Sequence, residues 1–292
     1  MSLAIDIVLA GLVLGGMYAL IAMGLTLQYG VARIMNLSYG EFLIAAAFAS
    51  HWLFTGWAIS PFVGLTLVVP VAFVLNFAIY KVLLTPLVRR APNRDALEVD
   101  SILATFGLTF VIQGSMLALF GGAYYSYSFL AFPVQFVGET VAANRLAALG
   151  ITIVLGLALY LALTRTRAGT AIRAVAVDPF AAQLVAINVP QASALTFALG
   201  GALVAAAGVL VSTFLTFSAS SGVVFTMKAL IVVVMGGVGN MLGCLVAGLA
   251  LGLSEALVAS YVDPGLTLAV NFALFLIVLL VKPAGLFGRA TR

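Results

Sequence analysis

The sequence is poor in charge and in chemically reactive side chains. Only 8% of its 292 residues are Asp, Glu, Lys or Arg, and it holds one cysteine and one histidine. Because an average soluble domain is about a quarter charged, a soluble globular protein is excluded. A single Cys244 permits no internal disulfide, and lone His51 has no partner at metal-ligand spacing. The first 32 residues contain no Lys or Arg, so we expect no signal peptide with a basic start.

Apolar residues, in contrast, make up 64% of the chain, and the mean hydropathy is +1.25. The apolar runs are continuous rather than alternating, which favours membrane helices over barrel strands. We therefore expect an all-α fold, a polytopic integral membrane bundle with one domain over residues 1–292. The net charge is +4, and the basic residues lie at the ends of the apolar segments. This placement indicates a chain that crosses the lipid bilayer and does not bind nucleic acid.

Polar breaks divide the chain into nine expected spans of about 20 residues each. They cover about 7–29, 38–56, 61–82, 101–121, 146–164, 191–216, 223–238, 241–261 and 265–281. The basic loops 83–99 and 165–190, and the tail with Lys282, Arg289 and Arg292, are expected in the cytoplasm. This requires an odd number of crossings, about nine, and an external N-terminus. If residues 225–238 are re-entrant, the number of crossings falls.

Two further features of these spans are expected. Gly11 and Gly15 give the first span a face on which another helix can pack closely. Residues 122–145 are rich in tyrosine, which favours the headgroup region of a bilayer. We therefore expect them to form an external interfacial loop.

The loop 165–190 is predicted to hold a short helix from Pro179 to Ile187. Asp178 can accept the first free backbone amides and proline fits the first turn, while Asn188 and Pro190 provide the stop. Two interpretations remain open: a helix lying on the lipid surface, or a docking helix gripped by a soluble partner. Residues expected to take part in docking are Arg173, Asp178, Pro179, Phe180, Leu184, Ile187 and Asn188, with Phe180, Leu184 and Ile187 on one face.

Two segments combine an apolar run beginning Ala-Leu-Ile with a glycine and a following asparagine, around residues 19–40 and 229–243. Glycine-interrupted spans in two halves of a chain indicate a transport pathway, because freed backbone groups must face protein or water. Ionisable residues lie near both breaks. The candidate pathway residues are Asn36, Tyr39, Gly40, Glu41, Lys228, Gly236, Gly237, Gly239, Asn240 and Glu255. The alternative is that Glu41 and Glu255 lie near the membrane interfaces or form structural ion pairs with Arg33 and Lys228.

No motif for catalysis is found. There is no phosphate-binding G-x-x-x-x-G-K-[ST] motif, and Gly236-Gly-Val-Gly239 lacks the following lysine. No nucleophile and base stand together. The chain is therefore expected not to be an enzyme, not to hydrolyse ATP, and to bind no cofactor or metal.

The sequence resembles a known family in motifs spread from about residue 7 to 288. These are GMYALIAMGLTLQYG at 16–30, Asn36-x-x-x-Gly40-Glu41, RTRAG at 165–169, IRAVAVD at 172–178, AIN at 186–188, MKA at 227–229, GGVGN at 236–240, LSEAL at 253–257 and KPAGLFG at 282–288. Together they are similar to permease subunits of branched-chain amino-acid ABC importers (LivH type). The resemblance covers both broken segments and the loop 165–190.

The resemblance implies a set of partners in the bacterial inner membrane. It implies a second related permease, with a heterodimer favoured over a homodimer, and two cytoplasmic ATPases that bind the loop 165–190 and use the ATP. It also implies a periplasmic binding protein that delivers the solute. Branched-chain or other amino acids are the solutes expected from this resemblance.

Two positions depart from the family's pattern. Tyr39 stands where the family commonly has histidine, and Ala186 stands where glycine is usual. The first departure keeps other solutes open, such as urea, short amides or another small organic molecule. From the residues alone two other classes also remain: an ion-coupled transporter or channel using Glu41 and Glu255 without ATPases, and an inert membrane scaffold.

Overall fold

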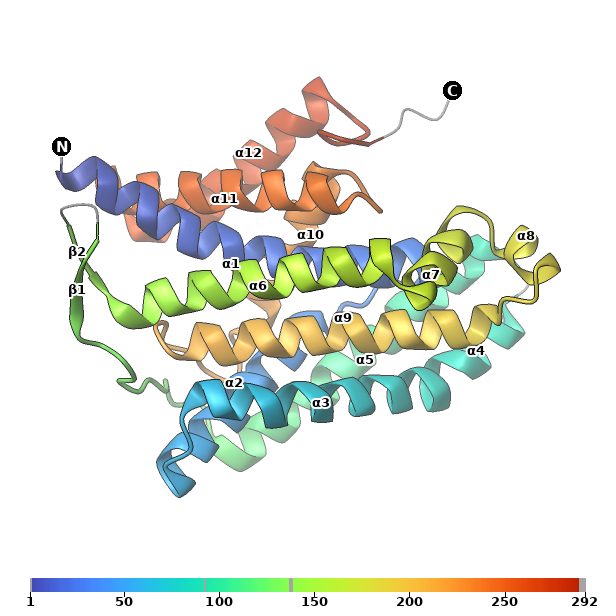
Figure 1. Ribbon diagram of the computed structural model, residues 1–292, viewed down its shortest axis with the longest axis horizontal. Helices are drawn as coiled ribbons and strands as arrows, with labels where there is room; N and C mark the ends of the chain where they lie inside the picture. Colours follow the sequence, from blue (N-terminus) through green and yellow to red (C-terminus); the bar gives the residue numbers. More distant parts are fainter. Residues whose placement is uncertain (1, 92, 137–138, 289–292) are drawn as a thin grey trace.

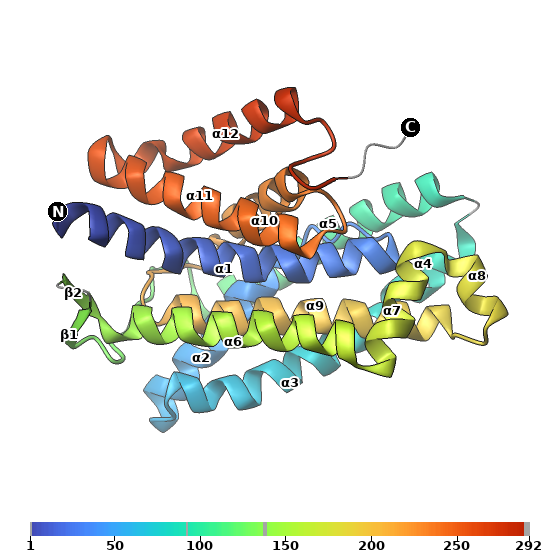
Figure 2. The same cartoon turned by 45° about the horizontal axis from the view of Figure 1, so that its top comes forward.

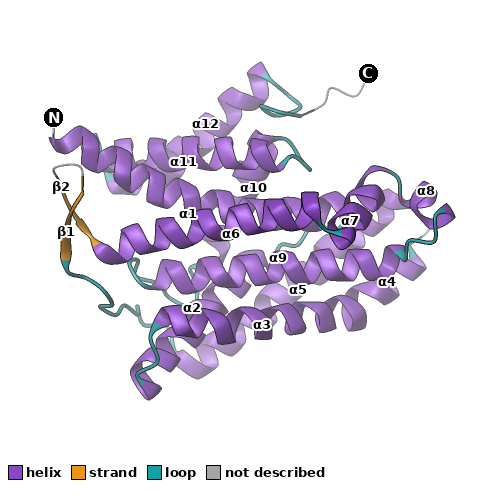
Figure 3. Cartoon of the chain, viewed as in Figure 1, coloured by secondary structure: helices purple, strands orange, loops and turns teal. Residues whose placement is uncertain are grey.

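The computed structural model describes residues 2–91, 93–136 and 139–288, so Arg289 and Arg292 lie outside the described residues. Helices make up nearly all of the fold (Figures 1 and 3). The first half comprises α1 (Ser2–Ala32), α2 (Tyr39–Trp57), α3 (Pro61–Ile79), a π-helical turn (Tyr80–Leu84), α4 (Thr85–Arg90), α5 (Arg94–Phe120) and the strands β1 (Pro133–Phe136) and β2 (Glu139–Ala142). The second half comprises α6 (Ala143–Arg165), α7 (Arg167–Val177), α8 (Pro179–Leu184), α9 (Val189–Ser212), α10 (Gly222–Gly236), α11 (Met241–Tyr261), a 3-10 turn (Pro264–Leu266) and α12 (Thr267–Val281).

The long helices run roughly along one axis of the molecule (Figures 1 and 2). At one end lie the N-terminus and the β1–β2 hairpin, which we call the hairpin end. At the other end lie α4, α7 and α8, which we call the α8 end. Helices α1 and α9 occupy the interior, since 78% and 83% of the residues in their most apolar 18-residue stretches are buried. The corresponding shares are 11% for α5 and 6% for α12, so these outer helices offer apolar faces to lipid or to another subunit.

Glycines allow α1 and α11 to pack closely, as the first span was predicted to do. A Cβ atom on Gly11 would lie 2.7 Å from the Leu253 side chain, and one on Gly15 would lie 2.8 Å from the Leu249 Cα atom. Both distances are shorter than real Cβ contacts, so larger residues there would push α11 away. The prediction of a small-residue face on this helix is confirmed.

Nine apolar helices match the nine predicted segments in order, but two of them are not full spans by length and hydropathy. Seven helices of the described chain are long and apolar enough to cross a membrane. The other two are α2, which is not among the seven, and α10, which has 15 residues and is roughly 22 Å long. The total of about nine crossings, and the external N-terminus, therefore stay predictions.

The predicted loop 83–99 is wrong, because α3 continues through the π-helical turn and α4 as far as Arg90, and α5 begins at Arg94. Pro86 lies in the first turn of α4, where a missing N–H is tolerated. The Tyr80 carbonyl accepts both the Thr85 amide, which is the i→i+5 bond of the π-helical turn, and the Thr85 hydroxyl, at 3.0 Å. The connection between the helices shrinks to residues 91–93.

The predicted loop 122–145 is not wholly irregular. Its second half forms the antiparallel hairpin of β1 and β2, which pairs Val134 with Val141, and α6 follows directly at Ala143. Tyr125 also exchanges backbone hydrogen bonds with Phe217, at 2.8 and 3.0 Å. This bridge attaches the tyrosine-rich segment to the connection between α9 and α10.

Candidate functional site

The loop 165–190 holds two helices, whereas the sequence analysis predicted one. Thr166 caps α7, because its hydroxyl accepts a hydrogen bond from the Gly169 amide at 3.0 Å. Ile172 and Val175 are buried three residues apart on one face of α7. A threonine cap followed by this spacing is the sequence signal for α7.

The predicted start of α8 is confirmed. The Asp178 carboxylate accepts hydrogen bonds from the amides of Phe180 and Ala181, at 2.9 and 3.1 Å. Pro179 is the first residue of the helix. The negative carboxylate also lies at the positive end of the helix dipole. Asp178 and Pro179 therefore set where the helix begins.

The predicted end of α8 at Ile187 is wrong, because the helix ends at Leu184 and is only about 9 Å long. Ala186 adopts a left-handed conformation with φ of 61°. Its amide donates to the Gln183 carbonyl at 3.0 Å, and the Ile187 amide donates to the Ala182 carbonyl at 3.1 Å. This pair of bonds is the Schellman motif that closes helices, with alanine where glycine is usual.

Two of the predicted docking residues take other roles as a result. Ile187 is half-buried and packs against the core of the bundle, so it does not share the exposed face of Phe180 and Leu184. Asn188 caps the next helix, since its side chain accepts from the Gln191 amide at 3.0 Å. It therefore starts α9 and does not only stop α8.

Four apolar side chains around α8 are exposed and form what we call the α8 patch. They are Val177, Phe180, Leu184 and Val185, with exposed fractions of 87%, 71%, 75% and 69%. Val177 and Val185 were not predicted, because Val177 precedes the helix and Val185 lies off the i, i+4, i+7 face of the predicted one. Large apolar residues this exposed at the tip of a protein indicate a contact with lipid or with another protein.

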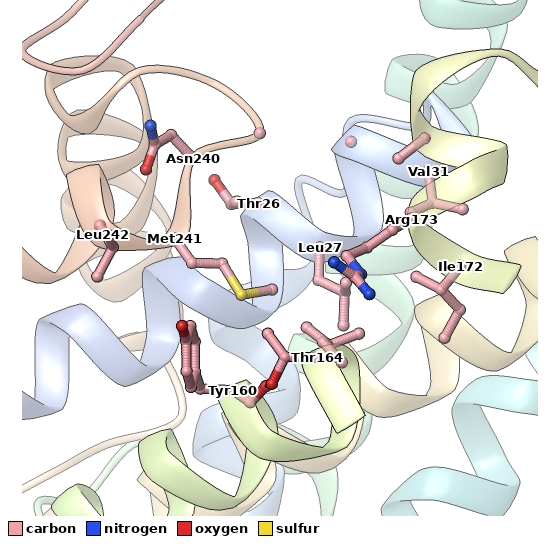
Figure 4. Close-up of a pocket in the computed structure, with 14 residues that line it drawn as sticks. Thr26, Leu27, Val31, Tyr160, Thr164, Ile172, Arg173, Asn240, Met241 and Leu242 are labelled. Atoms are coloured by element: carbon pink, nitrogen blue, oxygen red, sulfur yellow. The ribbon is translucent and has the colours of Figure 1, made fainter. Parts of the chain in front are cut away.

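Arg173 lies behind this patch, not in it. It lines a cavity of about 270 Å³ between α1, α6, α7 and the turn that joins α10 to α11. Figure 4 shows the guanidinium pointing toward Leu27 of α1. Tyr160 and Thr164 of α6 line the opposite wall. Arg173 is therefore exposed at the wall of this cavity and is not part of the α8 patch.

The second predicted break, at Gly236–Asn240, is a turn between α10 and α11. Gly237 and Gly239 have φ of 98° and 84°, which favour glycine. The Asn240 side chain accepts from the Gly243 amide at 2.9 Å and donates to the Phe287 carbonyl at 3.1 Å, so it caps α11 and holds the C-terminal segment. The predicted repeat is thus misplaced, because these residues turn the chain and do not interrupt a span.

The start of α2 after the first break meets the start of α10, which follows the segment 213–221. Helix α2 begins beside the middle of α9, where the Tyr39 hydroxyl donates to the Gly200 carbonyl at 2.8 Å. The Gly40 amide donates to the Thr226 hydroxyl of α10 at 2.8 Å. The first turns of α2 and α10 therefore meet inside the bundle. From this meeting point α2 continues toward the hairpin end and α10 continues toward the α8 end.

The Asn36 side chain forms hydrogen bonds within the segment that joins α1 to α2. Its side-chain oxygen accepts from the Ser38 amide and hydroxyl, at 3.1 and 2.7 Å, and its amide group donates to Gln28 at 3.3 Å. The Leu37 amide donates to the Thr105 hydroxyl of α5 at 3.1 Å. These bonds satisfy polar groups that an interrupted helix exposes in an apolar environment.

Lys228 and Glu255 form the one ion pair among the described residues, with 2.7 Å between Nζ and Oε1. The Tyr18 hydroxyl donates to Glu255 at 3.0 Å, and Asn271 donates to it at 3.4 Å. The Lys228 ammonium lies 4.7 Å from the centre of the Tyr18 ring. Since these residues come from α1, α10, α11 and α12, the cluster joins four helices. For Lys228 and Glu255, the geometry agrees with the alternative of a structural ion pair.

Glu41 is arranged differently. The residue is fully buried in the first turn of α2, and its carboxyl group lies against Gly222 at the start of α10. Neither carboxyl oxygen has a hydrogen-bond partner among the described residues. Arg33, its suggested partner, is exposed and forms no ion pair with it. The two predicted carboxylates therefore differ, because Glu255 is paired and Glu41 is not.

In the described part of the chain, no three His, Cys, Asp or Glu side chains come close enough to hold a metal ion. His51 instead lies against the rings of Tyr125 and Tyr127, and buried Cys244 lies 3.1 Å from the Thr26 hydroxyl. Both side chains therefore pack within the bundle.

Comparison with known proteins adds to this geometry. Residues 7–279 match the model of the family described as "Branched-chain amino acid transport system / permease component". The chain is 32% identical to the high-affinity branched-chain amino acid transport system permease protein LivH of Escherichia coli (strain K12), over 96% of this chain and 94% of the relative. It is 28% identical, over the same shares, to the corresponding permease protein BraD of Pseudomonas aeruginosa. No solved structure matches this chain significantly.

Proposed function

The chain belongs to the family of permease components of branched-chain amino acid transport systems, and we propose that it forms half of the solute path of an ATP-driven importer. The solute is an amino acid, as the names of its relatives suggest. A second, related permease forms the other half. Two ATPase subunits use the ATP, a periplasmic protein delivers the solute, and this chain binds no cofactor.

The α8 patch supports the part of this proposal that concerns the ATPases. The patch stands at the tip of the molecule beside α4, where Arg89 and Arg90 lie, and α7, where Arg167 begins the helix (Figure 1). By the positive-inside rule this basic end faces the cytoplasm of a bacterial inner membrane. Exposed apolar side chains on a short, firmly capped helix suit a groove in a soluble partner. Helix α7 and Arg173 then transmit movement of α8 to α1.

The meeting of the two interrupted helices supports the part that concerns the path. Interrupted helices with their N-termini near the membrane midplane are typical of solute sites in transporters. Tyr39 and Thr226 hold the two helix starts to α9 and to each other. ATP binding and hydrolysis bias two arrangements of these helices, one open to each side.

The docking role is tested by Phe180→Asp and Leu184→Asp, each combined with purification of the assembled complex. Burying one large apolar side chain stabilises a contact by roughly 1.5–3 kcal/mol, and burying a carboxylate instead adds a further cost. We expect each variant to insert normally and to lose the ATPase subunits. Val262→Asp, an exposed apolar position between α11 and α12, is the control and should keep them. Normal co-purification and coupled ATPase activity in both α8 variants would exclude the docking role.

A further inference from the structure

Glu41 and the first turn of α10 form a site that the bundle itself leaves without partners. The Glu41 side chain is fully buried, and neither of its carboxyl oxygens accepts a hydrogen bond from the described residues. Buried carboxylates in proteins are normally paired or hydrogen-bonded. Glu255, whose side chain is 13% exposed, follows this rule through Lys228, Tyr18 and Asn271. The exception at Glu41 therefore calls for a partner from outside the chain.

The start of α10 provides groups of the opposite sign beside this carboxyl group. Ser221 precedes the helix and makes no side-chain cap. The first amides of α10, those of residues 222–224, have no partner within the helix and receive no side-chain cap among the described residues. Free amides at a helix start carry partial positive charge and bind carboxylates and phosphates. An acceptor and a set of donors thus stand side by side at the junction of two interrupted helices.

This junction lies just below the surface of the chain. Val223, Val224 and Met227 are exposed to 41%, 42% and 43%, so one face of the α10 start is uncovered. Glu41 lies beneath Gly222, and a Cβ atom at that position would come within 2.5 Å of the carboxyl group. Because Gly222 has no side chain, only a backbone segment separates the carboxyl group from the uncovered face.

We propose that this junction binds the solute as a zwitterion, with the ammonium on Glu41 and the carboxylate on the free amides at the start of α10. This inference rests on the proposed function and names the groups that hold its amino-acid solute. A charge-assisted hydrogen bond between ammonium and carboxylate is roughly twice as strong as a neutral one. Urea or a simple amide carries no charge and leaves Glu41 unpaired, so the site discriminates against these solutes.

The test uses the assembled complex in proteoliposomes with ATP inside and the loaded binding protein outside. Uptake of L-leucine and ATPase activity are measured for the wild type, Glu41→Gln, Glu41→Asp and the control Glu98→Gln. Glu98 is a half-buried acid that accepts a hydrogen bond from Tyr29 at 2.9 Å. We expect E41Q to lose at least tenfold in uptake while it keeps assembly and stimulated ATPase activity. E41D should recover part of the uptake, and E98Q should resemble the wild type.

Wild-type uptake by E41Q would overturn the proposal. If E41Q does not assemble, the wild-type complex decides, through labelling of Glu41 by a hydrophobic carbodiimide followed by mass spectrometry. L-leucine should slow this labelling several-fold, and 4-methylpentanamide, which lacks both charges, should not. Labelling unaffected by L-leucine would overturn the proposal. Failure of the proposed function is distinguishable, because the wild-type complex itself would then take up no L-leucine with ATP.

Discussion

The hydroxyl of Tyr39 donates a 2.8 Å hydrogen bond to the backbone carbonyl of Gly200, midway along α9. This contact fixes where α2 begins, and so determines the depth at which its first turn meets α10. A Cβ atom on Gly24 of α1 would collide with the same hydroxyl. Tyr39 is therefore enclosed between α1 and α9, and it stands where the resemblance leads one to expect histidine.

Removing this hydroxyl should weaken the junction without unfolding the bundle. A buried hydrogen bond contributes about 1 kcal/mol, so Tyr39→Phe should lower the melting temperature of the purified chain by about 2–4 °C. Tyr124→Phe is the control, since Tyr124 is 78% exposed and should leave the melting temperature unchanged. Equal melting temperatures for Tyr39→Phe and the wild type would show that the bond does not hold α2 in place.

Gly222 should accept no side chain, because Glu41 fills the space beside it. Gly222→Ala should destabilise the chain by about 1–3 kcal/mol, the usual cost of overpacking a buried position. Gly107 of α5 has no atom within 4 Å of its Cβ position, so Gly107→Ala should be neutral or slightly stabilising. Thermal unfolding of both variants measures the difference. Equal effects at the two positions would mean that Glu41 does not occupy this space.

The end of α8 should improve with the residue that is usual there. Ala186 has φ of 61°, a conformation that costs an alanine roughly 1 kcal/mol or more, and glycine adopts it freely. Ala186→Gly should therefore slow hydrogen exchange of the Ile187 amide, which closes the helix. Ala181→Gly, inside the same helix, should have the opposite effect. Faster exchange at Ile187 in Ala186→Gly would contradict this assignment of the turn.

The Lys228–Glu255 pair should behave as a structural connection between helices. Removing one partner of a buried pair costs about 3–5 kcal/mol, because the other charge is left unpaired. Lys228→Met should thus destabilise the chain far more than Lys228→Met combined with Glu255→Leu. Lys81→Met, an exposed position in the π-helical turn, should change stability little. Additive effects of the single changes in a double-mutant cycle would show that the two residues do not interact.

Much of the bundle follows from the sequence because each outer helix is a continuous apolar run bounded by charges or glycines. The positions at which α8 and α11 begin can also be predicted, since Asp178 and Asn240 are residue types that cap helices. The depth at which α2 begins was not, because it depends on Tyr39 reaching Gly200, some 160 residues away in the chain. No local pattern records such a contact.

The misplaced second break has a similar physical origin. Glycines at 236, 237 and 239 suggest an interrupted span, yet they serve a tight turn and the close approach of α10 to α11. The segment 213–221 before α10 contains Ser218-Ala-Ser-Ser221, which by composition is an ordinary turn. Only the contact between Gly40 and Thr226 identifies it as the partner of the first break.

Reconstituted uptake tests the assignment most directly. The assembled complex is placed in proteoliposomes, and uptake of L-leucine is followed with and without ATP, in the presence of ionophores that dissipate ion gradients. We expect uptake that requires ATP, the ATPase subunits and the binding protein, and that is unaffected by the ionophores. Uptake by this chain alone, driven by an ion gradient and independent of ATP, would contradict its assignment as half of an ATP-driven importer.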